Sequence, residues 1–237
     1  MAKGVGTTIL FVPAPCCYDC GMIKDIYISV DVEADGPYPG DYSMTALGAV
    51  VAGYRTLEGE IVRFDVTAEE NRFYTEIRPI SDNWVPEAMA VGLFSGFGSD
   101  AAAKDPDGEL RRAYIMEHGT EPIAAMTGFA QFILDIKKRH EGAPIFAGFP
   151  LGFDWMFTYW YLCKFSELGS PFGHSRHIDI KTLYAEKANS LITRAVKRNM
   201  PKALRSTLPH THLGVDDAAE QGELLMNILE WEGKSKG

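Results

Sequence analysis

The first half of the chain alternates apolar and polar positions in short runs, which is the pattern of β-strands. Residues 25–31 alternate strictly and predict a strand with one apolar face. Runs rich in β-branched and aromatic residues, separated by turn residues, predict further strands at 44–51, 61–66 and 73–77. Consecutive strands joined by short connections favour an antiparallel meander.

The second half changes character after Pro79. Residues 82–120 predict a loop-rich stretch with short helical pieces, because the glycines of 92–98 are too many for a helix interior. The elements that follow alternate in type: a helix at 123–138, a buried strand at 143–147, an aromatic helix at 153–165, a strand at 178–180, a helix from Leu183 and an amphipathic helix at 216–231. Strands first and alternating elements afterwards predict an α/β fold, a mixed sheet with helices packed on it.

Residues 1–21 resemble neither half. They hold Gly, Thr, Pro and Cys in no helical or strand period, and the apolar piece 8–12 is too short and too weakly flanked for a signal peptide. We expect 1–21 to be a disordered, dispensable leader. A chain of 237 residues is long enough for one well-packed domain, and we expect 22–237 to form it.

The four cysteines point to a reduced protein. Cys16, Cys17 and Cys20 form half of a zinc pattern, but no second Cys or His pair at suitable spacing completes it. Cys163 lies in an aromatic, helical stretch and is expected to be a small buried hydrophobe. With no apolar run of membrane-spanning length, we expect a cytoplasmic protein without membrane contact.

Charge narrows the kind of partner. A net charge of −9 argues against coating nucleic acid through a broad basic surface. It leaves room for binding a short end through metal ions, since bound cations outweigh local protein charge. Residues 187–215 carry six Lys and Arg and no acid, so this segment is expected to guide a phosphate backbone, although a solvated helix face also explains it.

Three acidic motifs stand at element boundaries. Asp31 and Glu33 end the first predicted strand and point to one side, where Mg²⁺ or Mn²⁺ relieves their repulsion; alone they also fit a solvated strand end. Asp154 falls in the first turn of the aromatic helix, where a capping role is an equal alternative. His212 precedes Asp217 by five residues, in a turn that also reads as an ordinary helix start.

Together, in this order and context, the motifs resemble the DEDDh exonuclease family, which has a ribonuclease H-like fold. The resemblance covers 25–231 and rests on these pieces: Asp31-x-Glu33, the following Ala46-Leu47-Gly48-Ala49-Val50, Phe153-Asp154, Ile178-Asp179, and His212 five residues before Asp217-Ala218. Two places depart from the family pattern. Phe149-Pro150 stands where the family has His-Asn, and 82–120 is longer and less regular than the family pattern.

The resemblance implies a mixed sheet, antiparallel over its first three strands and then parallel, flanked by helices. It implies a metal-dependent 3′→5′ exonuclease acting on single-stranded 3′ ends of DNA or RNA. Four carboxylates would hold two Mg²⁺ or Mn²⁺ ions and a histidine would act as general base. The expected catalytic residues are Asp31, Glu33, Asp154, Asp217 and His212, and the expected substrate contacts are Ala34, Arg194, Lys197 and Arg198.

Several alternatives stay open at this point. His210 lies seven residues before Asp217, so we expect it to be a loop residue, and His118, His140, His174 and His177 to be surface or structural. A metal-dependent phosphodiesterase of small nucleotides fits the same motifs, as does an end-binding module whose site has decayed. The pattern also leaves the oligomeric state open, a homodimer included.

Overall fold

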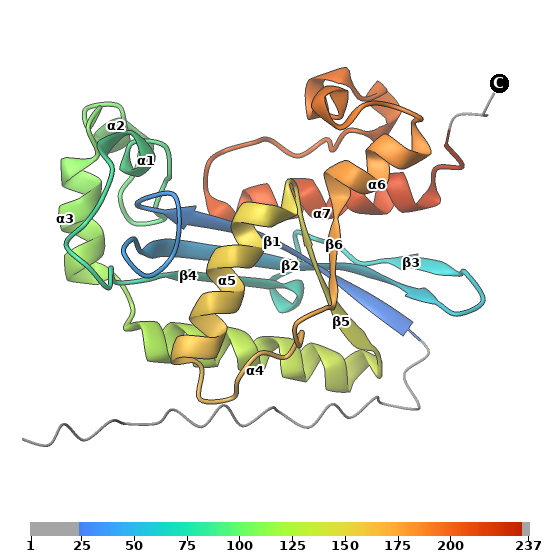
Figure 1. The fold of residues 1–237 in the computed structure, drawn as a ribbon, viewed down its shortest axis with the longest axis horizontal. Coiled ribbons are helices and arrows are strands. Elements are labelled where there is room, and N and C mark those ends of the chain that lie inside the picture. Colours follow the sequence, from blue (N-terminus) through green and yellow to red (C-terminus); the bar gives the residue numbers. More distant parts are fainter. Residues whose placement is uncertain (1–23, 234–237) are drawn as a thin grey trace, which may run out of the picture.

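A computed structural model describes residues 24–233 (Figure 1). These residues form a sheet of six strands, ordered β3-β2-β1-β5-β6, with β4 also paired to β2. The strands are β1 (Lys24–Ala34), β2 (Met44–Thr56), β3 (Ile61–Arg63), β4 (Arg72–Glu76), β5 (Ala143–Gly148) and β6 (His177–Asp179). The expected leader and its three cysteines lie outside the described residues.

The strand directions confirm the predicted mixed sheet. β1 pairs antiparallel with β2 and parallel with β5, and β5 pairs parallel with β6. The meander is shorter than expected, because β3 and β4 pair with different stretches of the same edge of β2. They share one row of the sheet, so the fourth predicted strand does not extend it.

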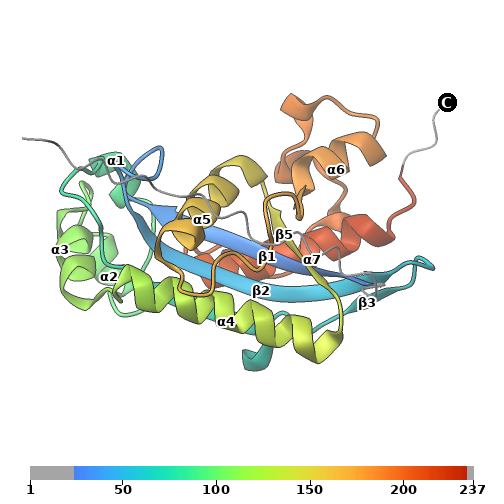
Figure 2. The ribbon, with the colours of Figure 1, turned by 60° about the horizontal axis from the view of Figure 1, so that its bottom comes forward.

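Helices cover both faces of the sheet (Figure 2). In the described part of the chain they are α1 (Pro86–Met89), α2 (Ser99–Ala102), α3 (Glu109–His118), α4 (Pro122–His140), α5 (Leu151–Phe165), α6 (Ile180–Lys187) and α7 (Gly214–Glu230). α4 and α5 pack on one face, whereas α6 and α7 pack on the other. None of the helices within residues 24–233 is long and apolar enough to span a membrane.

Strand β1 is buried on both faces, where the alternation predicts a single apolar face. Ile26 and Ile28 pack against α4 and α5. Tyr27 faces the opposite side and joins the cluster of α6 and α7. Ser29 on that side is fully buried as well. The positions of β1 that alternate with the isoleucines are therefore not exposed to solvent, because α6 and α7 cover that face.

Three local expectations were wrong. Helix α6 begins at Ile180, three residues before Leu183, because Asp179 Oδ1 accepts a hydrogen bond from the Thr182 N–H and caps the helix there. It ends at Lys187, and 188–213 continue with short 3₁₀ turns at Ile192–Arg194, Lys197–Asn199 and Lys202–Leu204. Cys163 is exposed on α5, because other residues of the helix form its buried face.

The stretch 82–120 is loop-rich, as expected, and carries α1, α2 and the ten-residue α3. It forms a lobe at one end of the sheet (Figure 1). A buried ion pair between Arg112 and Asp35 attaches the lobe to the chain just after β1. Glu76, the last residue of β4, accepts hydrogen bonds from the Ser95 N–H and the Tyr114 hydroxyl. Polar anchors thus hold the lobe beside the end of β1.

The start of α7 lies directly on the sheet because two glycines meet there. A Cβ on Gly48 in β2 would stand 2.1 Å from the Val215 nitrogen and 2.2 Å from the Gly214 carbonyl carbon. Gly214 itself would bring a Cβ to 3.3 Å from the Asp31 carbonyl oxygen. At Gly48 only a residue without a side chain allows this approach, and at Gly214 a Cβ would be a tight fit.

Replacing Gly48 with Ala is expected to destabilise the fold by about 1–3 kcal/mol, the usual range for overpacking, because backbone atoms have to move. Thermal unfolding should show a melting temperature several degrees lower. Gly152→Ala is the matched control, since a Cβ there meets nothing within 4 Å. Equal melting temperatures for the two variants would contradict this account of the α7 contact.

Candidate active site

The end of β1 carries Asp31 and Glu33 beyond the region that β5 covers. β5 pairs with β1 only as far as Ser29 opposite Ala147, so the next residues of β1 have no neighbouring strand on that side. On the other side Asp31 stands opposite Gly48 of β2. The two carboxylates therefore occupy a free edge at the carboxyl end of a parallel pair, the usual place for ligand sites in α/β sheets.

Asp154 fills the place where β5 stops. Its Oδ1 accepts a hydrogen bond from the Val32 N–H at 3.2 Å, between the two acids of β1. Helix α5 is fixed at its start by Asp179, whose Oδ2 accepts the Leu151 N–H at 2.7 Å. The acid in the first turn of α5 is thus not a helix cap. Its carboxylate accepts the backbone hydrogen bond that a neighbouring strand would otherwise accept. It therefore lies in the same cleft as the carboxylates of Asp31 and Glu33.

Asp217 organises the loop before α7. Its carboxylate accepts hydrogen bonds from the Thr211 N–H at 2.9 Å and the His212 N–H at 3.1 Å. His212 adopts a left-handed backbone conformation, with φ of 62°, which costs a non-glycine residue about 1 kcal/mol or more. The Leu93 N–H donates to the His212 carbonyl oxygen at 2.8 Å. The histidine is held from both sides, by α7 and by the 82–120 lobe.

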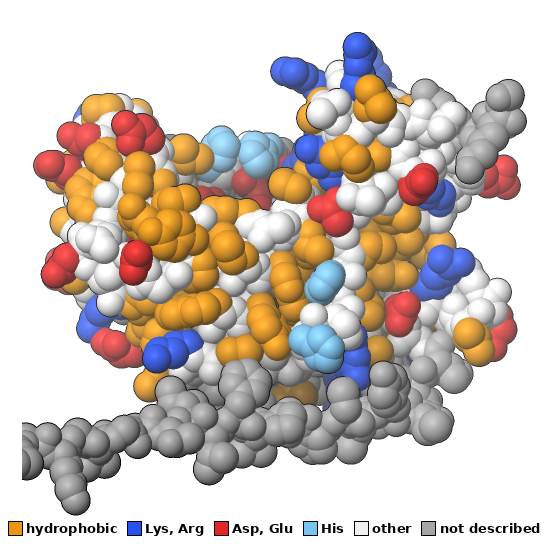
Figure 3. Space-filling view, in the orientation of Figure 1, with side chains coloured by type: hydrophobic (Ala, Val, Ile, Leu, Met, Phe, Trp, Pro, Cys, Tyr) orange, Lys and Arg blue, Asp and Glu red, His pale blue; other side chains and the backbone are white. Residues whose placement is uncertain are grey.

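These side chains line one cleft of about 300 Å³. In the space-filling view, histidine and acidic side chains show in the hollow between the 82–120 lobe and the α6 region (Figure 3). The structure brings together all five predicted catalytic residues, namely Asp31, Glu33, Asp154, Asp217 and His212. Residues to which the sequence analysis assigns no role at the site also line it: Val91, Phe149, Phe153 and His210.

His210 lies closer to the acids than its place in the sequence indicates. Its Nδ1 is 3.0 Å from Asp217 Oδ1 and 3.1 Å from Glu220 Oε2, and its ring contacts that of His212 at 4.5 Å between centroids. It is a loop residue, as expected, yet it borders the cleft. The ion pair of the neighbouring Asp216 with Arg72 draws that acid away, which distinguishes it from Asp217.

The remaining histidines do not line the cleft. His118 ends α3 and contacts Tyr114, and His140 ends α4 against Phe64. His177 begins β6 and packs on Trp155.

Burial among like charges dominates the electrostatics of the cleft. Desolvation, reinforced by Asp154, Glu33 and Asp217, raises the pKa of Asp31 well above its usual range. Desolvation together with Asp217 and Asp154 raises the pKa of Glu33 to about 8. Desolvation raises the pKa of Asp154 to about 7, although the Val32 N–H opposes the shift. The cluster therefore favours either protons or a cation at neutral pH.

The donor set fits a hard divalent cation. Ligand oxygens of Asp31, Glu33 and Asp217 lie within 4.8 Å of one another, and buried carboxylates at that spacing repel unless positive charge separates them. A second group, His210, His212 and Asp217, also brings its ligand atoms within 4.8 Å of one another. Acidic residues able to bind metal are thus gathered at the end of β1.

The expected substrate contacts lie in different environments. Ala34 packs into the core with 9% of its surface exposed and does not line the cleft. Lys197 lies beside the cleft, with its amine 2.6 Å from Glu220 Oε2 and over the ring of Phe149. Arg194 and Arg198 are exposed, and their side chains make no hydrogen bond or ion pair with other residues in 24–233.

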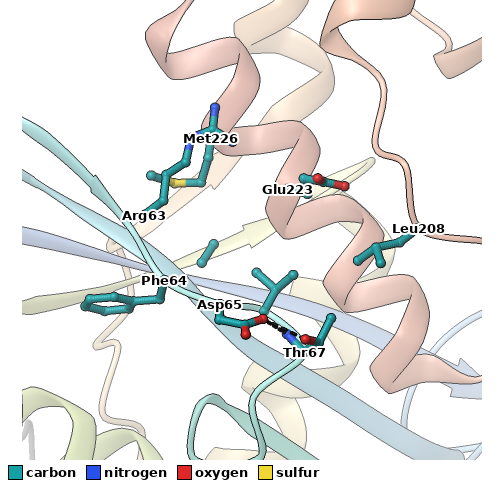
Figure 4. A pocket seen from close by; sticks show the side chains of 9 residues that line it. Arg63, Phe64, Asp65, Thr67, Leu208, Glu223 and Met226 are labelled. Atoms are coloured by element: carbon teal, nitrogen blue, oxygen red, sulfur yellow. Dashed lines mark hydrogen bonds between the residues drawn. The ribbon is translucent and has the colours of Figure 1, made fainter.

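A second hollow, of about 260 Å³, lies between the β3–β4 connection and α7 (Figure 4). Its polar side chains are already engaged. Arg63 pairs with Glu230, Asp65 accepts hydrogen bonds from Thr67, and Glu223 accepts the Thr207 N–H. Neither of the two residue groups able to hold a metal ion in the described part of the chain lies in this hollow.

The strand order, the flanking helices and the cleft of carboxylates make this an α/β protein with an acidic site at the end of its central strand. The chain is similar to the 3′-5′ DNA exonuclease Cap18 of Escherichia coli, with 31% identity over 216 residues that cover 90% of this chain and 96% of that protein. It belongs to the DEDDh family of 3′→5′ exonucleases.

Solved structures agree on the fold. The nuclease domain of 3′hExo, a DEDDh family member bound to rAMP, superposes with a TM-score of 0.54 at 15% identity, covering 90% of this chain and 96% of that chain. A 3′-exonuclease that recognises the 3′ end of a histone mRNA stem-loop gives 0.52 at 12% identity, covering 90% and 66%. No protein-family model matches the chain.

The raised pKa of Glu33 predicts a pH-dependent cost in metal-free protein. Unfolded Glu33 ionises near pH 4.5 and folded Glu33 near 8, so its contribution to stability is present at low pH and lost as pH rises through about 8. In EDTA, Glu33→Gln should therefore gain stability over wild type between pH 5 and pH 8, measured by urea unfolding. An unchanged difference at the two pH values would refute the assigned shift.

Proposed function

We propose that this exonuclease removes nucleotides from the 3′ end of a single DNA strand, with two divalent cations held by Asp31, Glu33, Asp154 and Asp217 and with His212 as general base. The observation that carries the proposal is the convergence of these five residues from β1, α5 and the start of α7 in one cleft.

A phosphodiester is negatively charged and would be repelled by four carboxylates, so cations fit the substrate as well as the site. Bound Mg²⁺ or Mn²⁺ would supply an activated water and neutralise charge on the phosphate and leaving oxygens. Glu33 and Asp217 would hold one ion with Asp31, in line with their ligand oxygens within 4.8 Å. Asp154, at the edge of β1 that β5 leaves free, would hold the second with Asp31.

His212 is exposed and lines the cleft, and an imidazole is the side chain best suited to exchange a proton near neutral pH. Hydrogen bonds to both its N–H and its carbonyl oxygen hold the backbone of His212 beside Asp217, so the imidazole leaves the chain next to that acid. We assign it the proton of the attacking water. His210 contacts Asp217 from the same loop and supports the loop, without a role in proton transfer.

DNA is favoured because the relative at 31% identity is a 3′-5′ DNA exonuclease. The walls of the cleft also suit a single strand. Val91, Phe149 and Phe153 place apolar surface around the acids, and aromatic rings stack on bases of any sequence. Exposed Arg194 and Arg198 on the 188–213 segment make no ion pair with the residues of 24–233 and would supply positive charge for the phosphate backbone.

The deciding assay uses oligonucleotides labelled at the 5′ end, as single-stranded DNA, single-stranded RNA and duplex DNA, with Mg²⁺ or Mn²⁺. We expect single-stranded DNA to shorten stepwise from its 3′ end with release of mononucleotides, and chelation to stop it. Preferential hydrolysis of nucleotide monoesters would indicate a small-nucleotide phosphodiesterase. Faster loss of RNA would correct the substrate.

Neutralising the site should remove turnover without unfolding the chain. Asp31→Asn and His212→Gln are expected to lower the single-turnover rate on DNA by about 10²-fold or more, the usual contribution of a metal ligand or general base. Asp216→Asn is the matched control, because that acid pairs with Arg72. Wild-type rates in Asp31→Asn, with circular dichroism unchanged, would overturn the assignment.

The basic segment should control binding more than chemistry. For single strands, log affinity falls with log salt with a slope of about −0.7 per neutralised phosphate. Reversing charge in Arg194→Glu/Arg198→Glu should therefore reduce that slope by about 1.4, measured by fluorescence anisotropy with Ca²⁺ in place of Mg²⁺. Lys138→Glu/Lys164→Glu reverses two exposed charges at the far ends of α4 and α5. An equal effect of both double variants would show that only net charge matters.

A further inference from the structure

A buried amide contacts the first carboxylate of the site. Gln221 lies on α7, four residues after Asp217, so both side chains leave the helix on the same face. Its Nε2 donates a hydrogen bond to Asp31 Oδ1 at 2.7 Å. Gln221 has 2% of its surface exposed. The contact spans 190 positions of sequence and joins α7 to the end of β1.

The packing around Gln221 leaves the side chain little freedom. A Cβ on the next residue, Gly222, would stand 3.1 Å from Val50 and 3.2 Å from Ala52. The helix therefore rests on the sheet with almost no gap, and Gln221 is enclosed between α7 and β1. Its amide makes its one hydrogen bond within the described residues to Asp31.

Nothing in the fold itself requires an amide at this position. Apart from Asp217, the other buried positions of α7 are apolar, among them Ala218, Leu224 and Leu225. Gln221 Oε1 is buried with no hydrogen-bond partner among the described residues, and an unsatisfied buried carbonyl costs stability. Methionine would fill a similar volume without that cost, so the amide nitrogen is the part of Gln221 that matters here.

That nitrogen acts on one oxygen of Asp31. An ionised carboxylate only accepts hydrogen bonds, and a donor at Oδ1 fixes the plane of the carboxylate while Oδ2 stays available. A neutral donor also leaves the negative charge of Asp31 intact, where Lys or Arg would cancel it. Partners of this kind hold ligating carboxylates at metal sites and change metal affinity when removed.

We propose that Gln221 is a positioning residue that orients the Asp31 carboxylate for its cation and thereby sets the metal affinity of the site. The inference rests on the proposed metal-dependent function, although it is tested by metal binding alone.

The experiment compares wild type, Gln221→Met and Gln221→Glu by Mn²⁺ binding, followed from the electron paramagnetic resonance signal of free Mn²⁺ without nucleic acid. Gln221→Met is expected to weaken binding about 10-fold or more, with the melting temperature of the metal-free protein equal or higher. Gln131→Met, on exposed α4 surface, is the matched control. The exonuclease rate of Gln221→Met should recover when Mn²⁺ is raised by the same factor.

Wild-type Mn²⁺ affinity in Gln221→Met would overturn the proposal, as would a rate that stays low at saturating Mn²⁺, since the amide would then serve the fold or the chemistry directly. If Gln221→Met does not fold, Gln221→Glu carries the test, because it keeps the shape and exchanges the donor for a carboxylate. Intact Mn²⁺ binding by wild type without nucleotide release would count against the proposed function and leave this inference standing.

Discussion

The site depends on how closely α7 approaches the sheet. Gly48 and Gly214 remove the side chains that would otherwise separate helix from strands, and the backbones come into direct contact. That contact places Asp217 and Gln221, one helical turn apart, over the end of β1. It also fixes the position of the loop that carries His212 relative to the sheet, because Asp217 accepts hydrogen bonds from the Thr211 and His212 N–H groups. A larger residue at either glycine would move all of these groups together.

The carboxylates create an electrostatic cost that the fold alone does not offset. Burial and mutual repulsion raise the pKa values of Asp31, Glu33 and Asp154, with Glu33 near 8. Backbone and amide donors compensate in part, from Val32 to Asp154 and from Gln221 to Asp31. The donors are neutral, so the carboxylates keep a negative potential that attracts cations. The end of β1 therefore presents carboxylates that are already in place to bind a metal ion.

Much of this arrangement is readable from the sequence. Periodicity located most of the strands and helices, and the spacing of Asp31-x-Glu33, Phe153-Asp154 and His212–Asp217 pointed to residues that the fold gathers in one cleft. His210, Gln221 and the role of 82–120 were not readable. Gln221 and the lobe act through contacts between distant segments, such as the Leu93 N–H on the His212 carbonyl, and no local pattern encodes such pairs. His210 reaches Asp217 only through the conformation of the loop before α7, which has no periodicity to predict it. Gly48 carried a signal, a glycine within a strand, that only the packing of α7 explains.

The early end of β5 has a consequence for the spacing of the site. Asp154 bonds to Val32 because β5 stops at Gly148 and leaves that N–H without a strand partner. The length of β5 therefore determines where α5 begins relative to β1. Two added residues would preserve the in-and-out alternation of the strand yet carry the start of α5 about 6–7 Å along β1, past the acids it has to meet. The length of this short strand, more than the identity of any side chain in it, sets the distance from Asp154 on α5 to Asp31 and Glu33 on β1.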